Sequence, residues 1–227
     1  MEIALQSDAN ASGYWTRARE NALRPDVVVR ECVLNQSKHY AHTSRRRTQV
    51  HIGEASDAVI GGDTIAVIAS GCRVALTDSP SVLHSIALTV LEVEDAAQVQ
   101  GATRHANVLR VGAHNMQNRP LLAELARTQQ PVILTRGHSA TISEWLCAAD
   151  GVARGGNDNV ILCESGIRTY ETATQFTLDV SAISFVKAEF NYPVIADVSN
   201  AAGNSTLVPA LARAAIAAGA DGITVSV

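Results

Sequence analysis

The chain has 227 residues, of which 47% are hydrophobic and 18% charged, and its formal net charge is −4. This composition provides a buried core for one domain, or for two small ones, and excludes disorder over most of the chain. The slight acidic excess disfavours a nucleic-acid binder, which needs basic residues to neutralise phosphates. No apolar run approaches the ~18 residues of a membrane span, and residues 1–10 are too polar for a signal peptide. We therefore expect a cytoplasmic protein that binds neither nucleic acid nor membrane.

The first 62 residues differ in character from the rest of the chain. They are polar and irregular up to a turn at residues 61–63, and they include a basic run at residues 45–47. We interpret this run as a solvated loop, because the remainder of the chain is acidic. The predicted organisation is an N-terminal extension over residues 1–62 followed by one domain over residues 63–227.

Short apolar strands alternate with helical segments from residue 63 onward. Runs rich in β-branched residues predict strands at residues 65–69, 88–93, 108–111, 131–134, 160–163, 194–198 and 222–227. Helical spacing of apolar residues predicts helices at residues 96–106, 121–128, 142–152 and 207–218. Continuously apolar strands separated by helices indicate a parallel sheet covered by helices. Because the chain lacks a Rossmann glycine fingerprint, we predict an α/β fold of the TIM-type (β/α) barrel class.

Polar residues follow these strands, at the ends where (β/α) barrels hold their catalytic groups. The candidates are Cys72, His114, Thr135, Arg136, His138, Glu164, Ser165, Arg168, Asp197, Asn200 and Ser226. A histidine in such a place can transfer protons near neutral pH, and the alternative is a loop histidine without a role. Glu164 and Asp197 are candidates for proton transfer or, alternatively, for ion pairs with Arg136 or Arg168.

The four cysteines form no C-x-x-C pair, so the sequence predicts neither a zinc site nor a disulfide framework. We interpret them as reduced thiols that pack as small hydrophobic groups. Cys72 is the exception, because it follows a predicted strand and would become a nucleophile if a nearby cation lowered the pKa of its thiol.

Several motifs at the strand ends resemble one enzyme family. They read V-G-A-H-N-M-Q-N at residues 111–118, L-T-R-G at 134–137, I-L-C-E-S-G-I-R-T at 161–169 and L-D-V-S-A at 178–182. Together with residues 197–200 and 214–220, they resemble the 3-deoxy-D-arabino-heptulosonate 7-phosphate (DAHP) synthases. The similar branch is type I beta, which is related to the 3-deoxy-octulosonate 8-phosphate synthases. The resemblance implies a TIM-type barrel in which a divalent metal assists the condensation of phosphoenolpyruvate with an aldose phosphate.

The metal site that the resemblance implies is incomplete in this sequence. It would consist of a cysteine, a histidine, a glutamate and an aspartate, and Cys72 matches the cysteine. Asn200 stands at the histidine position and Ser226 at the glutamate position, and the aspartate would lie beyond Val227. A thiolate and an amide suit a hard or borderline divalent ion poorly. We therefore expect no metal and no cofactor.

The phosphoenolpyruvate site that the resemblance implies has also changed. Thr135, His114 and Ser165 stand where a lysine and two arginines would bind the substrate, whereas Arg136 and Arg168 remain. Each charge-assisted contact to a phosphate or carboxylate contributes about 1.5–3 kcal/mol, so we expect weak binding of phosphoenolpyruvate.

Residues 73–108 provide only a short helix, a strand and a helix. The barrel is therefore expected to lack one βα unit, with its substrate-gripping loop, and also the last helix.

Three functions follow from these observations. The first is a repurposed enzyme that catalyses a metal-independent lyase, cyclase or isomerase step in specialised metabolism. In it, His114 is the acid or base, His138 and Glu164 assist, and the remaining candidates bind a small-molecule substrate. The second is a genuine DAHP synthase that uses phosphoenolpyruvate and erythrose 4-phosphate, and the third is a non-catalytic partner or regulator.

We also expect a homo-oligomer, because a shortened barrel leaves apolar flanks uncovered.

Overall fold

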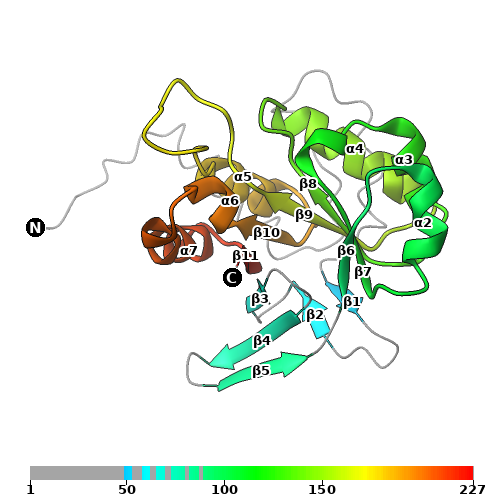
Figure 1. Cartoon of the computed structure of the whole chain (residues 1–227), viewed down its shortest axis with the longest axis horizontal. Helices are drawn as coiled ribbons and strands as arrows, with labels where there is room; N and C mark the ends of the chain where they lie inside the picture. The colour runs from blue at the N-terminus through cyan, green and yellow to red at the C-terminus, as the bar shows by residue number, and fades with distance from the viewer. Residues whose placement is uncertain are drawn as a thin grey trace, which may run out of the picture.

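The chain folds as an α/β protein built on one curled, mainly parallel sheet (Figure 1). The computed structural model describes residues 49–52, 58–61, 65–69, 73–79, 82–86 and 89–226. The sheet has nine strands in the order β5-β4-β3-β11-β10-β9-β8-β7-β6. The strands that pair in parallel are β3 (Ile65–Ala69), β6 (Val90–Glu92), β7 (Val108–Val111), β8 (Val132–Thr135), β9 (Val160–Glu164), β10 (Val194–Asp197) and β11 (Gly222–Val225).

Helices cover the outer face of this sheet. They are α2 (Ala96–Ala102), α3 (Arg119–Leu125), α4 (Ile142–Arg154), α5 (Val180–Glu189), α6 (Val198–Ala202) and α7 (Val208–Ala217). Short 3-10 turns occupy Ala113–Asn115 and Ser205–Leu207. Polar side chains fix where several helices begin, since Thr141 and Glu144 form a capping box at α4 and Asp179 caps α5. Within the part of the chain that the structure describes, no helix is both long and apolar enough to cross a bilayer.

All seven predicted strands are present, but the segment after β3 differs from the prediction. Residues 73–86 form an antiparallel hairpin of β4 (Arg73–Ser79) and β5 (Val82–Ile86), where a short helix was expected. Pro80 and its flanking serines favour a turn, and the segments on both sides contain β-branched residues, Val74 and Thr77 before it and Val82 and Ile86 after it. The hairpin adds two antiparallel strands beside β3. Helix α5 was also not predicted, because its sequence lacks a clear apolar stripe.

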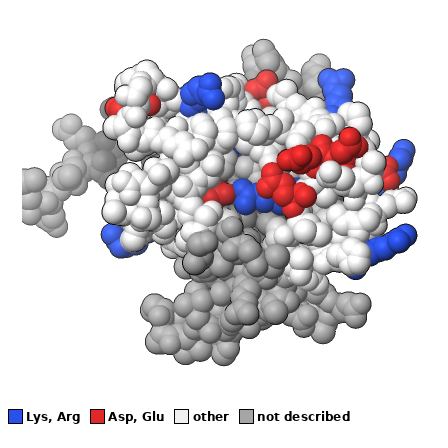
Figure 2. All heavy atoms as spheres, in the orientation of Figure 1, with Lys and Arg blue, Asp and Glu red and all other residues white. Residues whose placement is uncertain are grey.

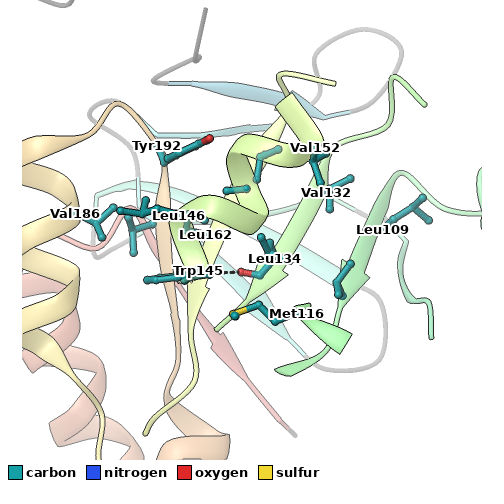
Figure 3. Close-up of a cluster of buried hydrophobic side chains, with 14 of the residues drawn as sticks. Leu109, Met116, Val132, Leu134, Trp145, Leu146, Val152, Leu162, Val186 and Tyr192 are labelled. Atoms are coloured by element: carbon teal, nitrogen blue, oxygen red, sulfur yellow. Dashed lines mark hydrogen bonds between the residues drawn. The ribbon is translucent and has the colours of Figure 1, made fainter. Parts of the chain in front are cut away.

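The outer core lies between the sheet and the helices. Figure 3 shows it around Trp145 of α4, which packs among Leu134 of β8, Leu162 of β9 and Met116. The Trp145 side chain is fully buried, and its Nε1–H donates to the Leu134 carbonyl oxygen at 3.0 Å. This hydrogen bond satisfies the one polar group of the indole, so a large aromatic ring can fill the core without an unpaired donor.

The inner core lies on the concave face of the sheet. It contains Val108, Ile133, Ile161 and Ile195, each within the first two residues of its strand, together with Ile68. The separate hairpin of β1 (Val50–Ile52) and β2 (Ala58–Ile60) packs its buried side chains, Val50, Ile52 and Ile60, into this cluster. Part of the predicted N-terminal extension therefore completes the interior at the amino end of the barrel strands. The boundary at residue 62 stays a prediction.

Candidate active site

The concave face changes from apolar to polar toward the carboxyl ends of the strands. Side chains two residues apart on a strand point to the same face, so polar residues two positions after the inner-core residues also face inward. We call the inward-facing polar set the mouth residues: Glu92, Arg110, Thr135, Cys163, Asp197 and Thr224, one from each strand from β6 to β11. They form the end of the barrel at which (β/α) enzymes carry out chemistry.

Arg110 reaches across the mouth. It starts from β7, and its Nη2 lies 2.6 Å from Asp197 Oδ2 on β10, so the guanidinium passes over the two strands between them. Its Nε lies 4.0 Å from Glu92 Oε2 on the other side. Figure 2 shows basic and acidic side chains side by side near the middle of the face in view. The mouth therefore holds one fixed cation between two carboxylates.

Three buried polar atoms at the ends of adjacent strands have no oxygen or nitrogen hydrogen-bond partner among the described residues. They are Arg110 Nε, Thr135 Oγ1 and Ser165 Oγ, which we call the donor arc. Thr135 and Ser165 are 2% and 1% exposed, and the Thr135 hydroxyl lies beside the Cys163 thiol. A buried polar group without a partner destabilises a protein by about 1–3 kcal/mol. Such groups at a strand end mark the place where ligand oxygens can be bound.

Arg136 and Glu164 belong to a different cluster, on the outer side of the sheet. Arg136 Nη1 donates to Glu164 Oε2 at 3.0 Å and to Asp179 Oδ2 at 2.9 Å, and its Nε donates to the Ala140 carbonyl. Glu164 also accepts the Gly166 backbone N–H. Burial raises the pKa of Glu164, while Arg136 and the Gly166 N–H oppose this rise. The structure thus brings these two predicted site residues together as an ion pair, the alternative foreseen from the sequence, and not with the mouth residues.

His114, His138 and Arg168 line a third place, a rim pocket of about 430 Å³ outside the mouth. The two histidine rings are 6.0 Å apart, and His138 stacks on Phe176 at 3.8 Å. His138 Nδ1 lies 2.8 Å from the Gly166 carbonyl oxygen, and the Arg168 backbone N–H donates to the His138 carbonyl. Gly166 has a φ of 92°, which only glycine adopts readily. The predicted acid–base pair is therefore close together, with His114 exposed and His138 half-buried.

Two further candidates support the mouth from α6 and from the end of β11. Asn200 Nδ2 donates to the Ser165 carbonyl at 2.9 Å, and the Asn200 backbone N–H donates to Asp197 Oδ1. Ser226 is exposed, and its backbone N–H donates to Ser199 Oγ. Asn200 therefore positions Ser165 and Asp197.

The implied metal site does not fit the residues that are described. Cys72 lies outside them, and within residues 89–226 and the described strands before them no three His, Cys, Asp or Glu side chains come together as metal ligands. The amide nitrogen of Asn200, at the histidine position, is used to hold a backbone carbonyl. An amide and a hydroxyl are weak ligands in place of an imidazole and a carboxylate.

Sequence reasoning missed Arg110, Glu92 and Asp179. Arg110 carried a usable signal, because it is the only charged residue within the apolar strand V-L-R-V. A charge at an inward position of a buried strand needs a partner or a function. Asp179 carried a weaker signal, since a helix cap accounts for it equally well.

Cys163 is expected to resist alkylation in the folded protein. Its side chain is fully buried, and burial raises the pKa of its thiol to about 12. At about pH 8 the thiolate, which is the reactive form, is therefore scarce. Iodoacetamide treatment followed by peptide mass spectrometry should find Cys163 unmodified in buffer and modified in urea. Rapid labelling in buffer would contradict its burial.

Comparison with known proteins identifies the family. Residues 76–227 match the family model described as "DAHP synthetase I family". The chain belongs to this family. A "Phospho-2-dehydro-3-deoxyheptonate aldolase" from Thermotoga maritima is 46% identical over 123 residues, which cover 54% of this chain and 36% of the relative. A "2-dehydro-3-deoxyphosphooctonate aldolase" from Pisum sativum is 27% identical over 154 residues, 61% of this chain and 52% of the relative.

A solved structure extends the likeness to the fold. It is a truncated form of 3-deoxy-D-arabino-heptulosonate 7-phosphate synthase from Thermotoga maritima, with a TM-score of 0.70, 30% identity and 80% coverage of both chains. This match confirms the shortened TIM-type barrel of the DAHP synthase family. The chain spans about half the length, or less, of the two curated relatives named above.

Proposed function

We propose that this member of the DAHP synthase family joins phosphoenolpyruvate to erythrose 4-phosphate in its barrel mouth. The observation that carries the proposal is the donor arc of Arg110, Thr135 and Ser165 at the carboxyl ends of adjacent strands. One guanidinium and two hydroxyl groups suit the carbonyl and carboxylate oxygens of a 2-oxo acid. The names of both relatives describe products of that class, a 2-dehydro-3-deoxy sugar acid bearing phosphate.

A phosphate-release assay tests the proposal. Mixing the protein with both substrates, with and without Mn²⁺, should release phosphate only when both are present, and mass spectrometry should find the seven-carbon product. Ser165→Ala should lower kcat/KM by about tenfold, since one buried hydrogen bond to a charged group is lost. Ser181→Ala is the matched control, because Ser181 is exposed on α5. No phosphate release under either condition would exclude this function.

A second function is supported by the neutral residues of the site. Thr135, His114 and Ser165 occupy positions where the family resemblance implies cations, and the rim pocket brings two histidines together. These features favour a metal-independent proton transfer on a less charged substrate, of the lyase, cyclase or isomerase type. A histidine would take a proton from the carbon beside a carbonyl, and the electron pair would move to the carbonyl oxygen.

Proton exchange separates the two functions. An EDTA-treated protein with the second function should exchange the C3 protons of a non-phosphorylated 2-oxo acid with D₂O, as followed by NMR, and should release no phosphate in the synthase assay. The His114→Ala/His138→Ala double variant should slow the exchange at least about 100-fold. Exchange at the wild-type rate in that variant would remove both histidines from the reaction.

A further inference from the structure

We infer that Arg110 is the ligand-binding cation of the mouth, and that its guanidinium polarises the carbonyl oxygen of a 2-oxo acid, a role for which the family resemblance implies a divalent metal. This inference rests on the proposed function, because a 2-oxo acid is the class of its condensation product. It adds a residue that neither the motifs nor the expected site residues include.

The first support is the way in which Arg110 is held. Its Nη2 donates to Asp197 Oδ2, and Asp197 is itself fixed by the Asn200 backbone N–H at 3.1 Å. On the opposite side, the Glu92 carboxylate lies so close to the backbone of Gly112 that a Cβ there would overlap it. The Asp197 carboxylate is thus held by a backbone hydrogen bond and the Glu92 carboxylate lies against Gly112, so the guanidinium is placed between two carboxylates before a ligand binds.

The second support is the donor that this arrangement leaves unused. Arg110 Nε is buried and has no hydrogen-bond partner among the residues described, although the same side chain makes a short ion pair through Nη2. The Thr135 hydroxyl, from the next strand, is also unpartnered by oxygen or nitrogen within that part of the chain and is almost fully buried. The Arg110 Nε–H and the Thr135 hydroxyl, which also contacts the Cys163 sulfur, lie on neighbouring strands of one concave face and can bind oxygen atoms of a ligand.

The third support is the charge balance of the mouth, which favours a neutral carbonyl oxygen over a charged ligand oxygen at the Arg110 guanidinium. Asp197 and Glu92 already oppose the single positive charge of Arg110. A further carboxylate or phosphate oxygen on the guanidinium would add to this negative excess, whereas a carbonyl oxygen would not. Polarisation of a carbonyl is also what a divalent ion provides in an active site, and a partly buried guanidinium offers it without metal ligands.

Arginine side-chain NMR tests the inference on the whole chain. Pyruvate, the smallest stable 2-oxo acid, is the probe, and the protein is dialysed against EDTA before titration. Pyruvate should shift the Nε–H signal of Arg110, assigned by its loss in Arg110→Lys, and should leave in place the signal of Arg136, which is more deeply buried and already paired with Glu164. Movement of the Arg136 signal instead, or binding only after Mn²⁺ is added, would overturn the inference.

The affinity of variants provides the second measurement. Arg110→Gln should weaken pyruvate binding about ten- to hundred-fold. Arg110→Lys should weaken pyruvate binding less, because lysine keeps the positive charge and loses only the Nε–H. Arg127→Gln is the matched control, since Arg127 is exposed and its ion pair among the described residues is with Glu124, three positions earlier. Unchanged pyruvate affinity in the folded Arg110→Lys and Arg110→Gln proteins would contradict the inference. If Arg110→Gln fails to fold, Arg110→Lys still provides the test, because its ammonium group keeps a positive charge beside Asp197.

The synthase assay distinguishes failure of this inference from failure of the proposed function. Arg110-dependent pyruvate binding without phosphate release would reject the condensation and support Arg110 as the carbonyl-binding residue. Phosphate release by Arg110→Gln at the wild-type rate would support the condensation and reject the role of Arg110.

Discussion

Trp145→Ala should lower the free energy of unfolding by about 3–5 kcal/mol, the range measured when a fully buried large aromatic side chain is removed. The indole lies in the middle of the outer core (Figure 3), and the neighbouring strands and helix can close only part of the cavity left behind. The Leu134 carbonyl would also lose its 3.0 Å hydrogen bond from the indole N–H. Urea unfolding followed by far-ultraviolet circular dichroism measures the loss.

Two controls separate packing from hydrogen bonding. Trp145→Phe keeps an aromatic ring and removes the donor, so it should lower stability by only about 1 kcal/mol beyond the change in ring size. Tyr170→Ala removes a side chain that is 98% exposed and should change stability by less than about 0.5 kcal/mol. A Trp145→Ala protein as stable as Tyr170→Ala would show that α4 does not pack on the sheet in this way.

Arg136→Met should be about as damaging, with a loss of about 3–5 kcal/mol near neutral pH, because it leaves buried charge without its partner. Glu164 is fully buried and Asp179 mostly so, and both accept from Arg136 Nη1. Methionine fills much of the space of the arginine stem, so the loss reports mainly on charge. Urea unfolding again measures it, with Arg127→Met as the control for an exposed ion pair.

The loss in Arg136→Met should depend on pH, in a direction that the Glu164 carboxyl determines. Burial already raises the pKa of Glu164, and removing Arg136 removes a group that opposes this rise. The folded variant therefore holds the Glu164 proton more tightly than the unfolded chain does. The contribution of Glu164 to the stability of the variant is fully present below the unfolded pKa of about 4.3 and is lost as the pH rises through the raised folded pKa. The difference from wild type should be smaller at about pH 5 than at about pH 8, and equal differences would argue against Glu164 as the cause.

Much of the fold could be predicted because its signals are local. A continuous β-branched run such as V-I-L-C-E at β9 has few alternatives to a buried parallel strand. The antiparallel hairpin at residues 73–86 was missed because expectation for that stretch came from the length of the family's βα unit and not from its own alternation and Pro80 turn. Helix α5 was missed because apolar residues such as Val180 and Phe185 lie beside its buried residues, Ala182, Ile183 and Val186, so their helical spacing does not stand out as a stripe.

The site could be predicted only in part, because the face that a strand-end residue presents depends on register. Thr135 and Ser165 were named from the sequence and belong to the donor arc. Arg136 and Glu164 each lie one residue from an inward-facing position, so they point to the opposite face, where they meet Asp179. The catalytic roles of His114, His138 and Glu164, the small-molecule substrate and the expected homo-oligomer stay predictions.

The hairpin of β1 and β2 has a kinetic consequence. Val50, Ile52 and Ile60 are fully buried against the amino-terminal layer of the barrel, so apolar packing fills that end of the interior. Under the proposed function, substrates approach the donor arc from the carboxyl end, and a molecule bound deep in the mouth is covered by the one that follows it. The two-substrate reaction is therefore expected to follow a compulsory order, in which the substrate that lies deeper enters first and the product formed from it leaves last.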